Sequence, residues 1–190
     1  SRFSHDEEVA TAGYYAVLLQ DYGIRAELTA TTRVAYQRFT YPASAESHLL
    51  FNIGSQMGES GAVKDAEVRL NDDGSVEGYV VTLPEYVKKY QPGAEVPIYF
   101  SAQLDKRPTA WGIFKGREQT PDVCEAKGRG AGLYLTFPTK EGEQVTAKVG
   151  ISYTSIENAR QNRKAEAGKK NFDKVRRESH DVWREHLGRI

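Results

Sequence analysis

The stretch YYAVLLQDYGIRAELTAT, residues 14–31, has the pattern of a β-hairpin. Residues 14–19 are aromatic or aliphatic, and Asp-Tyr-Gly at 21–23 is typical of a turn. In residues 24–31 the even-numbered positions are apolar and the odd-numbered positions are polar. Because successive side chains of a strand point to opposite faces, this period of two predicts a strand with its apolar face buried. The stretch therefore predicts two antiparallel strands.

Runs of the same kind continue up to residue 153. Asn-Asp-Asp-Gly at 71–74 predicts a second hairpin. The same residues also resemble the start of a calcium-binding loop, but Glu77 comes too early in the sequence to be the closing ligand of such a loop. About ten short strands separated by turn signals predict a mainly β fold, an antiparallel β-sandwich. The further runs are VAYQRFTY (34–41, stopped by Pro42), HLLFNI (48–53), EVRL (67–70), VEGYVVTL (76–83), PIYFSAQL (97–104), TAWGIFK (109–115), GLYLTF (132–137) and VTAKVGISYTS (145–155).

Residues 154–190 differ from the rest of the chain. Between residues 155 and 187 there is no proline, Ser155 and Asn171 are N-cap candidates, and Gly168 is a candidate break between two helices. Two interpretations of this helical region stay open: it packs back on its own sheet, or it links the sandwich to another domain. One stripe follows the second helix: Phe172, Val175, Ser179, Val182, Trp183, His186 and Leu187.

The composition limits the classes of partner. The chain has 26 Lys and Arg against 26 Asp and Glu, so its formal net charge of zero gives no general attraction to nucleic acid or to an anionic membrane. No apolar run approaches the about 20 residues that a membrane-spanning helix needs. Cys124, the single cysteine, can form no intrachain disulfide and lies in no nucleophile motif. We therefore expect no nucleic-acid partner and no membrane span.

A cluster of His5, Asp6, Glu7 and Glu8 precedes the first hairpin. His and carboxylate side chains bind metals and transfer protons. In an extended segment, however, adjacent side chains alternate between two sides, so only His5 with Glu7, or Asp6 with Glu8, is expected to share a face. The cluster is therefore either a site or a solvated approach to the strands.

Trp111 leaves a similar choice open. It is the one tryptophan of the β region. An exposed indole ring would stack on a sugar, whereas a buried ring would belong to the hydrophobic core, which is the commoner case. From the residues alone, the prediction stops at a β-sandwich with a helical tail.

Several motifs together resemble glycoside hydrolase family 92, the bacterial α-mannosidases. Residues 3–42, FSHDEEVATAGYYAVLLQDYGIRAELTATTRVAYQRFTYP, follow the family run FSHxxExAxPGYYxVxLxxxxIxxELTATxRxxxHRYxFP. Later segments are similar too, and the matches run in order from residue 3 to residue 190. Three positions depart from the pattern: Ala12 replaces proline, Gln37 histidine and Arg163 leucine. The later segments are IYFSAQLDKRPTAWG (98–112), VTAKVGISYTSIENARQNRKAE (145–166) and FDKVRRESHDVWREHLGRI (172–190).

The resemblance implies an exo-acting, inverting, calcium-dependent α-mannosidase that hydrolyses mannose-rich glycans. In that family a β-sandwich and a helical linker precede an (α/α)6 domain, which holds the catalytic acid, the base and the calcium ligands. Residues 1–153 would then be the sandwich and residues 154–190 the linker, with no catalytic residue and no metal ligand in this chain. His5 and Glu8 match a pattern beside a loop that reaches the substrate cleft. They join Trp111 as the substrate-binding candidates.

Our hypothesis is that the chain is part of a larger α-mannosidase and is inactive alone. In that enzyme it would form a wall of the cleft for a mannose-containing glycan and would support its own C-terminal catalytic domain. The alternative is a stand-alone carbohydrate-binding or structural β-sandwich module without catalysis. The resemblance also implies a periplasmic or secreted bacterial protein. We expect the stripe around Trp183 to be incompletely buried, because its neighbour in the larger enzyme would be absent.

Overall fold

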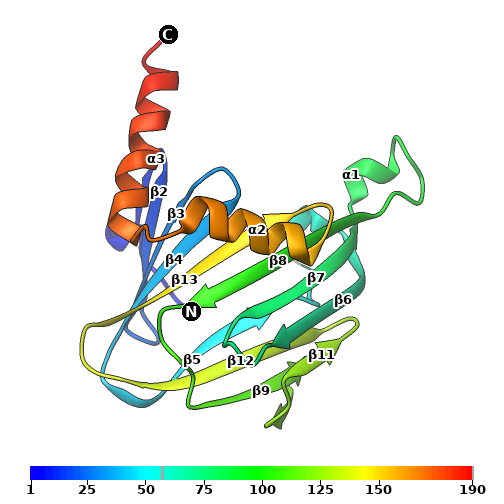
Figure 1. The fold of residues 1–190 in the computed structure, drawn as a ribbon, viewed down its shortest axis with the longest axis horizontal. Coiled ribbons are helices and arrows are strands. Elements are labelled where there is room, and N and C mark those ends of the chain that lie inside the picture. The colour runs from blue at the N-terminus through cyan, green and yellow to red at the C-terminus, as the bar shows by residue number, and fades with distance from the viewer. Residues whose placement is uncertain (57, 190) are drawn as a thin grey trace.

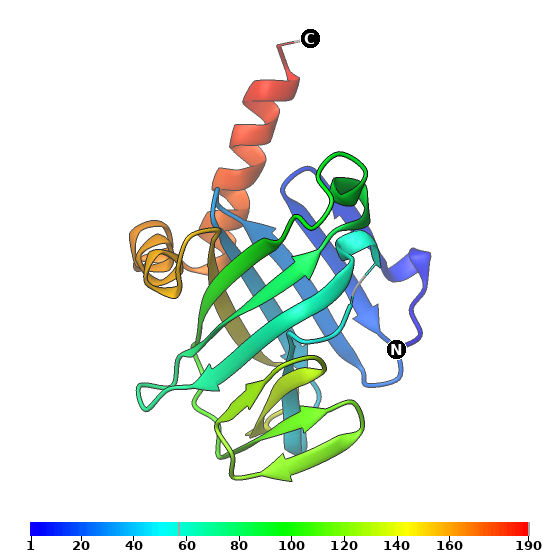
Figure 2. The ribbon, with the colours of Figure 1, turned by 90° about the vertical axis from the view of Figure 1, so that its right-hand side faces the viewer.

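The computed structural model describes residues 1–56 and 58–189, and its described part consists of two antiparallel sheets and two long C-terminal helices (Figures 1 and 2). Sheet A has nine strands in the order β1-β2-β3-β4-β13-β8-β7-β6-β11, and sheet B has four in the order β10-β9-β12-β5. The predicted mainly β sandwich with a helical C-terminal segment is confirmed. The strands are β1 (Val9–Thr11), β2 (Tyr14–Leu19), β3 (Ile24–Ala30), β4 (Val34–Tyr41), β5 (Ser44–Asn52), β6 (Ala62–Leu70), β7 (Val76–Leu83), β8 (Val96–Leu104), β9 (Ala110–Lys115), β10 (Glu118–Pro121), β11 (Glu125–Lys127), β12 (Ala131–Thr139) and β13 (Glu143–Ser152).

Local turn chemistry sets both predicted hairpins. β2 and β3 pair around the turn at 21–23, and β6 and β7 pair around the turn at 71–74. In the second turn Asn71 N donates to the Ser75 carbonyl at 2.8 Å, and Gly74 adopts a φ of +80°, which favours glycine. This segment is therefore a hairpin turn, the alternative that the sequence analysis favoured over a calcium loop.

The main hydrophobic core lies between the two sheets. Leu133, Leu135 and Phe137 on β12 are fully buried there, and Val68 and Val76 approach from sheet A. Burial of each such side chain stabilises the fold by about 1.5–3 kcal/mol. The other buried members are Tyr41, Leu49, Phe100, Ala102, Leu104, Ala126, Ala131, Val145 and Ala147.

Strand β3 corrects one part of the sequence analysis. The predicted apolar face is buried at Ala26 but exposed at Leu28 and Ala30. The polar residues Glu27 and Thr29, on the opposite face, are buried. The cause is that the C-terminal helices cover the outer face of sheet A, the face that carries Glu27 and Thr29. Buried polar groups are tolerated when they are hydrogen-bonded. Thr29 Oγ1 donates to the Gly13 carbonyl at 2.7 Å, and Glu27 has three donors.

Two long helices follow the last strand, as predicted. α2 (Ile156–Ala167) is capped by Ser155, whose Oγ accepts a hydrogen bond from Asn158 N at 3.0 Å. α3 (Phe172–Leu187) is capped by Asn171, whose Oδ1 accepts from Lys174 N at 2.9 Å. Gly168, with a φ of +45°, ends α2. The three shorter helical turns are η1 (His5–Glu7), η2 (Gly58–Ser60) and α1 (Glu85–Lys88).

α2 lies across β13 and β8 on the outer face of sheet A (Figure 1). Gly150 on β13 makes this close approach possible, because a Cβ atom there would lie 2.4 Å from the carbonyl oxygen of Ala159. Arg163, one of the departures from the family pattern, donates from Nε to Ser101 Oγ at 3.2 Å. Arg163 therefore contributes a polar contact on the helix face that meets the sheet.

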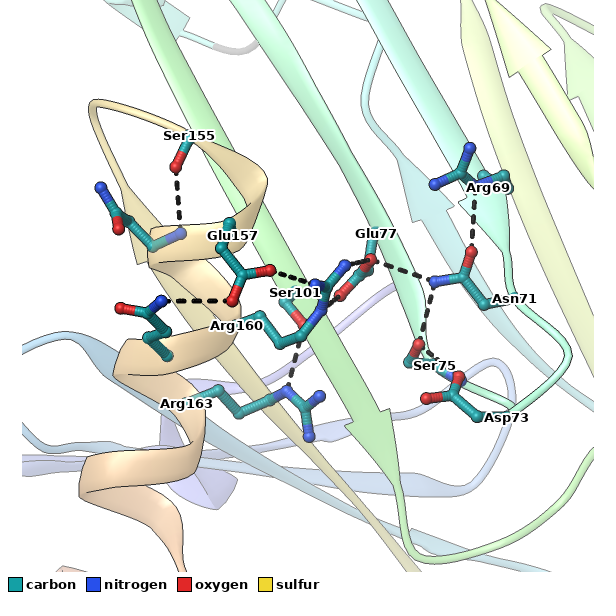
Figure 3. Close-up of polar contacts among 12 residues, drawn as sticks. Arg69, Asn71, Asp73, Ser75, Glu77, Ser101, Ser155, Glu157, Arg160 and Arg163 are labelled. Atoms are coloured by element: carbon teal, nitrogen blue, oxygen red, sulfur yellow. Dashed lines mark hydrogen bonds and ion pairs between the residues drawn. The ribbon is translucent and has the colours of Figure 1, made fainter.

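Glu77 on β7 is the polar centre of this contact, with 1% of its surface exposed. Arg160 of α2 holds both carboxylate oxygens, Nε to Oε1 at 2.8 Å and Nη2 to Oε2 at 2.7 Å (Figure 3). Ser101 and Asn71 donate to the same carboxylate at 2.8 and 3.1 Å. The hydrogen bonds from Arg160, the largest cause, lower the pKa of Glu77 against the opposing effect of burial.

α3 packs on the sheet along its first half. Phe172 and Val175 are buried with Tyr14, Val34 and Tyr36 in a second, smaller core on the outer face of sheet A. That part of the apolar stripe is fully buried within the chain. The expectation of incomplete burial is therefore wrong for Phe172 and Val175, because the outer face of β2 and β4 is itself apolar at these positions.

The second half of α3 projects beyond the sheet (Figures 1 and 2). The helix crosses the β1–β2 turn at Gly13, where a Cβ atom would lie 2.6 Å from Ser179 Oγ. Beyond this crossing Val182, Trp183 and Leu187 are about half exposed, Trp183 at 49%. The expectation of an incompletely buried stripe is confirmed for these three residues. The helical region thus packs back on its own sheet as far as Ser179 and then leaves it.

We predict that Glu77→Gln lowers the free energy of unfolding by about 2 kcal/mol, because Arg160 and Ser101 lose a charged partner in a buried position. Urea unfolding measures this loss. Glu157→Gln is the matched control, since Glu157 is a second partner of Arg160 but its side chain is 56% exposed. The control is expected to change stability by less than about 0.5 kcal/mol. Equal losses in the two variants would contradict the prediction.

The parent chain and Glu77→Gln can also be compared as a function of pH. The pKa of Glu77 lies below its ordinary value of 4.5, so its pairing stabilises the folded state above that pH and the contribution is lost as the pH falls through the lowered pKa. The difference in unfolding free energy between the parent chain and Glu77→Gln should be full at neutral pH and should shrink on acidification. A difference that does not depend on pH would show that the carboxylate charge is not its source.

Candidate functional site

The N-terminal segment is held against the β2–β3 turn. Arg2 donates from N and Nε to the two carboxylate oxygens of Asp21, at 2.7 and 2.6 Å. The carbonyl of Arg2 accepts a hydrogen bond from Gln20 N at 3.0 Å. These contacts fix the start of the segment that carries the predicted His and carboxylate cluster.

His5 and Glu8 meet because this segment is not extended, which corrects the sequence analysis. Residues 5–7 form the 3₁₀ turn η1, whose first turn is capped by Ser4 Oγ accepting from Asp6 N at 3.2 Å. In a 3₁₀ turn, side chains three positions apart lie on one side. His5 therefore faces Glu8 and not Glu7, and Glu7 accepts a hydrogen bond from Gln20 Nε2 at 2.9 Å instead.

Glu8 is the centre of what we call the N-terminal cluster: His5, Glu8 and Tyr15. Its Oε2 lies 2.5 Å from His5 Nδ1, and its Oε1 accepts a hydrogen bond from the Tyr15 hydroxyl at 2.6 Å. Sequence reasoning named His5 and Glu8 as candidates and missed Tyr15. The available signal was the Gly-Tyr-Tyr run within the family motif, which places Tyr15 on β2.

The electrostatics of the N-terminal cluster favour a charged Glu8. Hydrogen bonds from Tyr15, the larger cause, and from His5 lower the pKa of Glu8. The same contact with Glu8 raises the pKa of the Tyr15 hydroxyl. A catalytic general acid in a glycosidase needs a raised pKa, so Glu8 does not have the environment of one. A fixed carboxylate beside an exposed imidazole is suited to binding ligand hydroxyl groups.

An open groove of about 1360 Å³ adjoins the N-terminal cluster. It lies between the β1–β2 and β3–β4 turns and the helix α3, and Tyr15 belongs to both its wall and the cluster. Exposed apolar side chains form much of the wall: Leu28 comes from β3, and Val182 and Trp183 come from the projecting half of α3. The groove therefore combines an apolar surface with a polar group at its margin.

Trp111 lies in the other sheet. It is on β9, opposite the fully buried Leu135 of β12, and it packs against the main core while partly exposed. This is the core position that the sequence analysis gave as the commoner case. The structure thus joins His5 and Glu8 in one cluster and does not join Trp111 to them. A substrate contact for Trp111 stays a prediction.

A buried carboxylate near the groove is engaged by an arginine. Arg38 donates from Nε and Nη2 to the two oxygens of Glu27, at 2.8 and 2.9 Å, and the Tyr14 hydroxyl donates at 2.8 Å. Burial alone would raise the pKa of Glu27, but the hydrogen bonds from Arg38 and Tyr14 outweigh it and lower the pKa. Arg38 also reaches Asp173 at 3.0 Å and stacks 4.2 Å from the ring centroid of Phe172, so this pair attaches α3 to the sheet.

Within residues 1–56 and 58–189, no three or more His, Cys, Asp or Glu side chains gather in a group that could hold a metal ion. In the same part of the chain, no helix has the length and apolar character needed to cross a membrane.

Comparison with known proteins identifies the family. The model of the glycosyl hydrolase family 92 N-terminal domain matches residues 1–152. An uncharacterized secreted glycosidase of Arthroderma benhamiae is 28% identical over 204 aligned positions, which cover 97% of this chain and 26% of the relative. The family GH92 α-mannosidase BT3965 of Bacteroides thetaiotaomicron superimposes with a TM-score of 0.87 and 31% identity, over 99% of this chain and 25% of that protein.

A more distant solved structure shares the fold. The family GH92 inverting mannosidase BT2199 of Bacteroides thetaiotaomicron is 20% identical, with a TM-score of 0.79 over 98% of this chain and 24% of that protein. BT3965 has also been solved in complex with mannoimidazole. The chain therefore spans about a quarter of the length of these relatives. By its motifs, its sandwich and its family match, the chain belongs to glycoside hydrolase family 92, as the family's N-terminal domain.

Proposed function

We propose that the chain is the N-terminal domain of an exo-acting, inverting α-mannosidase that hydrolyses α-mannosidic linkages in mannose-rich glycans. The observation that carries the proposal is the likeness to BT3965, an α-mannosidase, over 99% of this chain at 31% identity. The likeness in fold to BT2199, an inverting mannosidase, is in keeping with inversion. The secreted relative supports an exported protein, which we propose is periplasmic or secreted and bacterial.

In this proposal the chemistry belongs to another part of the enzyme. Inversion needs two carboxyl groups about 6.5–9.5 Å apart, one with a raised pKa and one that activates water. The buried carboxylates Glu27 and Glu77 are held by arginines and have lowered pKa values, and Glu8 is held ionised by Tyr15. We therefore assign the catalytic pair and the calcium ligands to the domain that follows in longer relatives, and we take the present domain to be inactive alone.

The N-terminal cluster is the part of this chain that we assign to the substrate cleft. Glu8 offers an ionised acceptor of fixed orientation, and His5 offers an imidazole whose side chain is 85% exposed. Sugar hydroxyl groups are donors and acceptors that such groups bind directionally. The cluster would thus help to select the mannoside and would take no part in bond cleavage.

The projecting half of α3 is the surface that we assign to contact with the catalytic domain. Val182, Trp183 and Leu187 lie exposed on one side of the helix, and apolar patches of this kind mark contact sites. The first half of the helix is fixed to sheet A by Phe172 and by the Arg38 contacts with Asp173. A contact on the second half would therefore orient the two domains relative to each other.

The first prediction of this proposal concerns activity. The 190-residue chain should release no product from an aryl α-mannoside or from mannobioses, with or without calcium, whereas the complete protein should hydrolyse them. Turnover is measured by release of the aryl group and by chromatography of the sugars. Clear turnover by the chain alone would contradict the assignment of catalysis to another domain. If the chain binds mannosides and the complete protein is inactive, the result would favour the alternative of a stand-alone binding module.

The second prediction concerns Glu8. In the complete protein Glu8→Gln should raise KM for the mannoside by about 10-fold with little change in kcat, because the lost hydrogen bonds act on bound substrate and not on the reaction itself. Glu7→Gln is the matched control, since Glu7 lies in the same turn but pairs with Gln20. An equal effect of both substitutions, or a loss confined to kcat, would overturn the binding role of Glu8.

The third prediction concerns Trp183. In the 190-residue chain Trp183→Ser should change the free energy of unfolding by less than about 0.5 kcal/mol, because the side chain is half exposed. In the complete protein the same substitution should cost about 2 kcal/mol or more, because it removes an aromatic anchor from a buried contact. Arg184→Ser, at the adjacent exposed position, is the control. Equal effects of Trp183→Ser in the short and complete proteins would refute the docking role.

A further inference from the structure

The outer face of sheet B carries three rows of paired side chains. Because partners in an antiparallel pair point to the same side of a sheet, each row can be followed across the strands from the pairing register. Both long helices pack on sheet A, so this face of sheet B lies on the opposite side of the molecule from them (Figures 1 and 2). The rows are Gln119–Phe114–Gly132–Asn52, Pro121–Gly112–Tyr134–Leu50 and Ala110–Thr136–His48.

In the first row, the ring of Phe114 lies flat on the backbone of Gly132. A Cβ atom built on Gly132 would lie 2.1, 2.3 and 2.5 Å from the Phe114 ring atoms Cζ, Cε2 and Cε1. Three such similar distances require that this point be above the face of the ring, since a point beyond its edge would be much farther from the two Cε atoms. One face of Phe114 therefore covers the glycine and the other is directed away from the sheet.

In the second row the arrangement is reversed. The phenol of Tyr134, on β12, covers Gly112, on β9, and a Cβ atom there would lie 2.3 and 2.5 Å from its hydroxyl oxygen and Cζ. The two rows are two residues apart along each strand, about 7 Å. Phe114 and Tyr134 thus extend from neighbouring strands over each other's glycines. Each ring thus lies along the surface of the sheet and is partly exposed, and we call the two rings the aromatic platform.

The margin of the aromatic platform is polar but carries no Lys, Arg, Asp or Glu in the three rows. Asn52 and Gln119 are exposed at the two ends of the first row, and His48 is joined to Thr136 by a contact of 2.9 Å. Leu50, beside Tyr134, is 59% exposed. The three rows hold eleven residues without a Lys, Arg, Asp or Glu, although such residues make up 27% of the whole chain.

These features match the chemistry of a neutral sugar. A pyranose has an apolar face of C–H groups that stacks on an aromatic ring, and a rim of hydroxyl groups that bond to amides, hydroxyls and imidazoles. A nucleic acid would also stack on the rings, but its phosphates need cationic side chains, which the three rows lack. The absence of charge in the rows therefore matches an uncharged ligand with flat apolar faces.

We propose that the aromatic platform of Phe114 and Tyr134 is a binding surface for neutral polysaccharide chains. The two rings, from adjacent rows, contact successive sugar units, and Asn52, Gln119 and His48 bind hydroxyl groups at their margin. This surface attaches the protein to a glycan without acting on it. The proposal rests on the register and the ring geometry, and it stands whether or not the N-terminal cluster contacts substrate.

The test is native affinity electrophoresis of the complete protein in gels that contain a soluble mannan or a soluble β-glucan. The parent protein should be retarded by at least one of them. Phe114→Leu and Tyr134→Leu keep an apolar cover over the glycines but remove the flat ring, and each should weaken retardation about tenfold. Tyr134→Phe should retain binding. Tyr90→Ala, which removes a still more exposed aromatic residue from the segment after α1, should leave it unchanged.

A second measurement needs no substitution and covers the case in which a leucine variant fails to fold. In NMR spectra, the ring protons of Phe114 and Tyr134 should shift when a soluble oligosaccharide of the retarding polymer is added. No retardation by either polymer would overturn the proposal. Retardation that is the same in both leucine variants, or that occurs without a shift of these ring protons, would also overturn it.

Discussion

The carboxylate of Glu77 imposes the constraint on which the arrangement of the helices depends. It lies on β7, an interior strand of sheet A, with almost no exposed surface, and an ionised carboxylate in such a position is strongly destabilising without partners. Ser101 and Asn71 come from the sheet and the adjacent turn, but the cationic partner, Arg160, comes from α2. The helix therefore stabilises the sheet at this position, and any sliding of the helix would separate the buried carboxylate from its arginine.

The position of α2 in turn sets that of α3. Gly168 ends the first helix, and Asn171 begins the second where Phe172 enters the small core on β2 and β4. The ion pair of Arg38 with Glu27 resembles that of Arg160 with Glu77. In both pairs an arginine binds a carboxylate on the outer face of the sheet. Here the arginine also contacts the helix, through Asp173 and Phe172. Two ion pairs, each with a buried carboxylate, thus orient the helix whose far half projects from the domain.

The sequence could predict the features that are decided locally. The turn at 71–74, the end of β4 before Pro42 and the caps Ser155 and Asn171 each depend on a few adjacent residues, and all are confirmed. The prediction that β3 is a strand is confirmed, and its apolar side is buried at Ala26 but exposed at Leu28. The alternation of apolar and polar residues predicts that Leu28 is buried and Glu27 is exposed, and the structure shows the reverse. That outcome depends on Arg38 and on a helix about 150 residues further along the chain.

The site residues show the same division between local and long-range information. His5 and Glu8 can be identified by residue type and motif. Their contact, however, depends on a 3₁₀ turn for which the sequence has no strong signal. Tyr15 reaches Glu8 only because of the way the strands pair. Phe114 and Tyr134 give no signal at all in the linear sequence. Each ring lies along the sheet because a glycine is opposite it on the neighbouring strand, a relation fixed by the β9–β12 register.

The cleft wall that we propose requires hydroxyl-binding groups of fixed orientation, and the N-terminal cluster would supply them through the same kind of contact that stabilises the fold. In the pairs Arg38–Glu27 and Arg160–Glu77, arginines hold buried carboxylates ionised, and these pairs attach the helices to the sheet. In the N-terminal cluster, a tyrosine and a histidine hold Glu8 ionised at the surface, where its orientation is available to a ligand. Glu8, Glu27 and Glu77 each have a lowered pKa, whereas proton donation to a leaving group needs a raised one. Such carboxylates therefore suit the role that we propose for this domain, which is to position a glycan while another domain provides the catalytic acid and base.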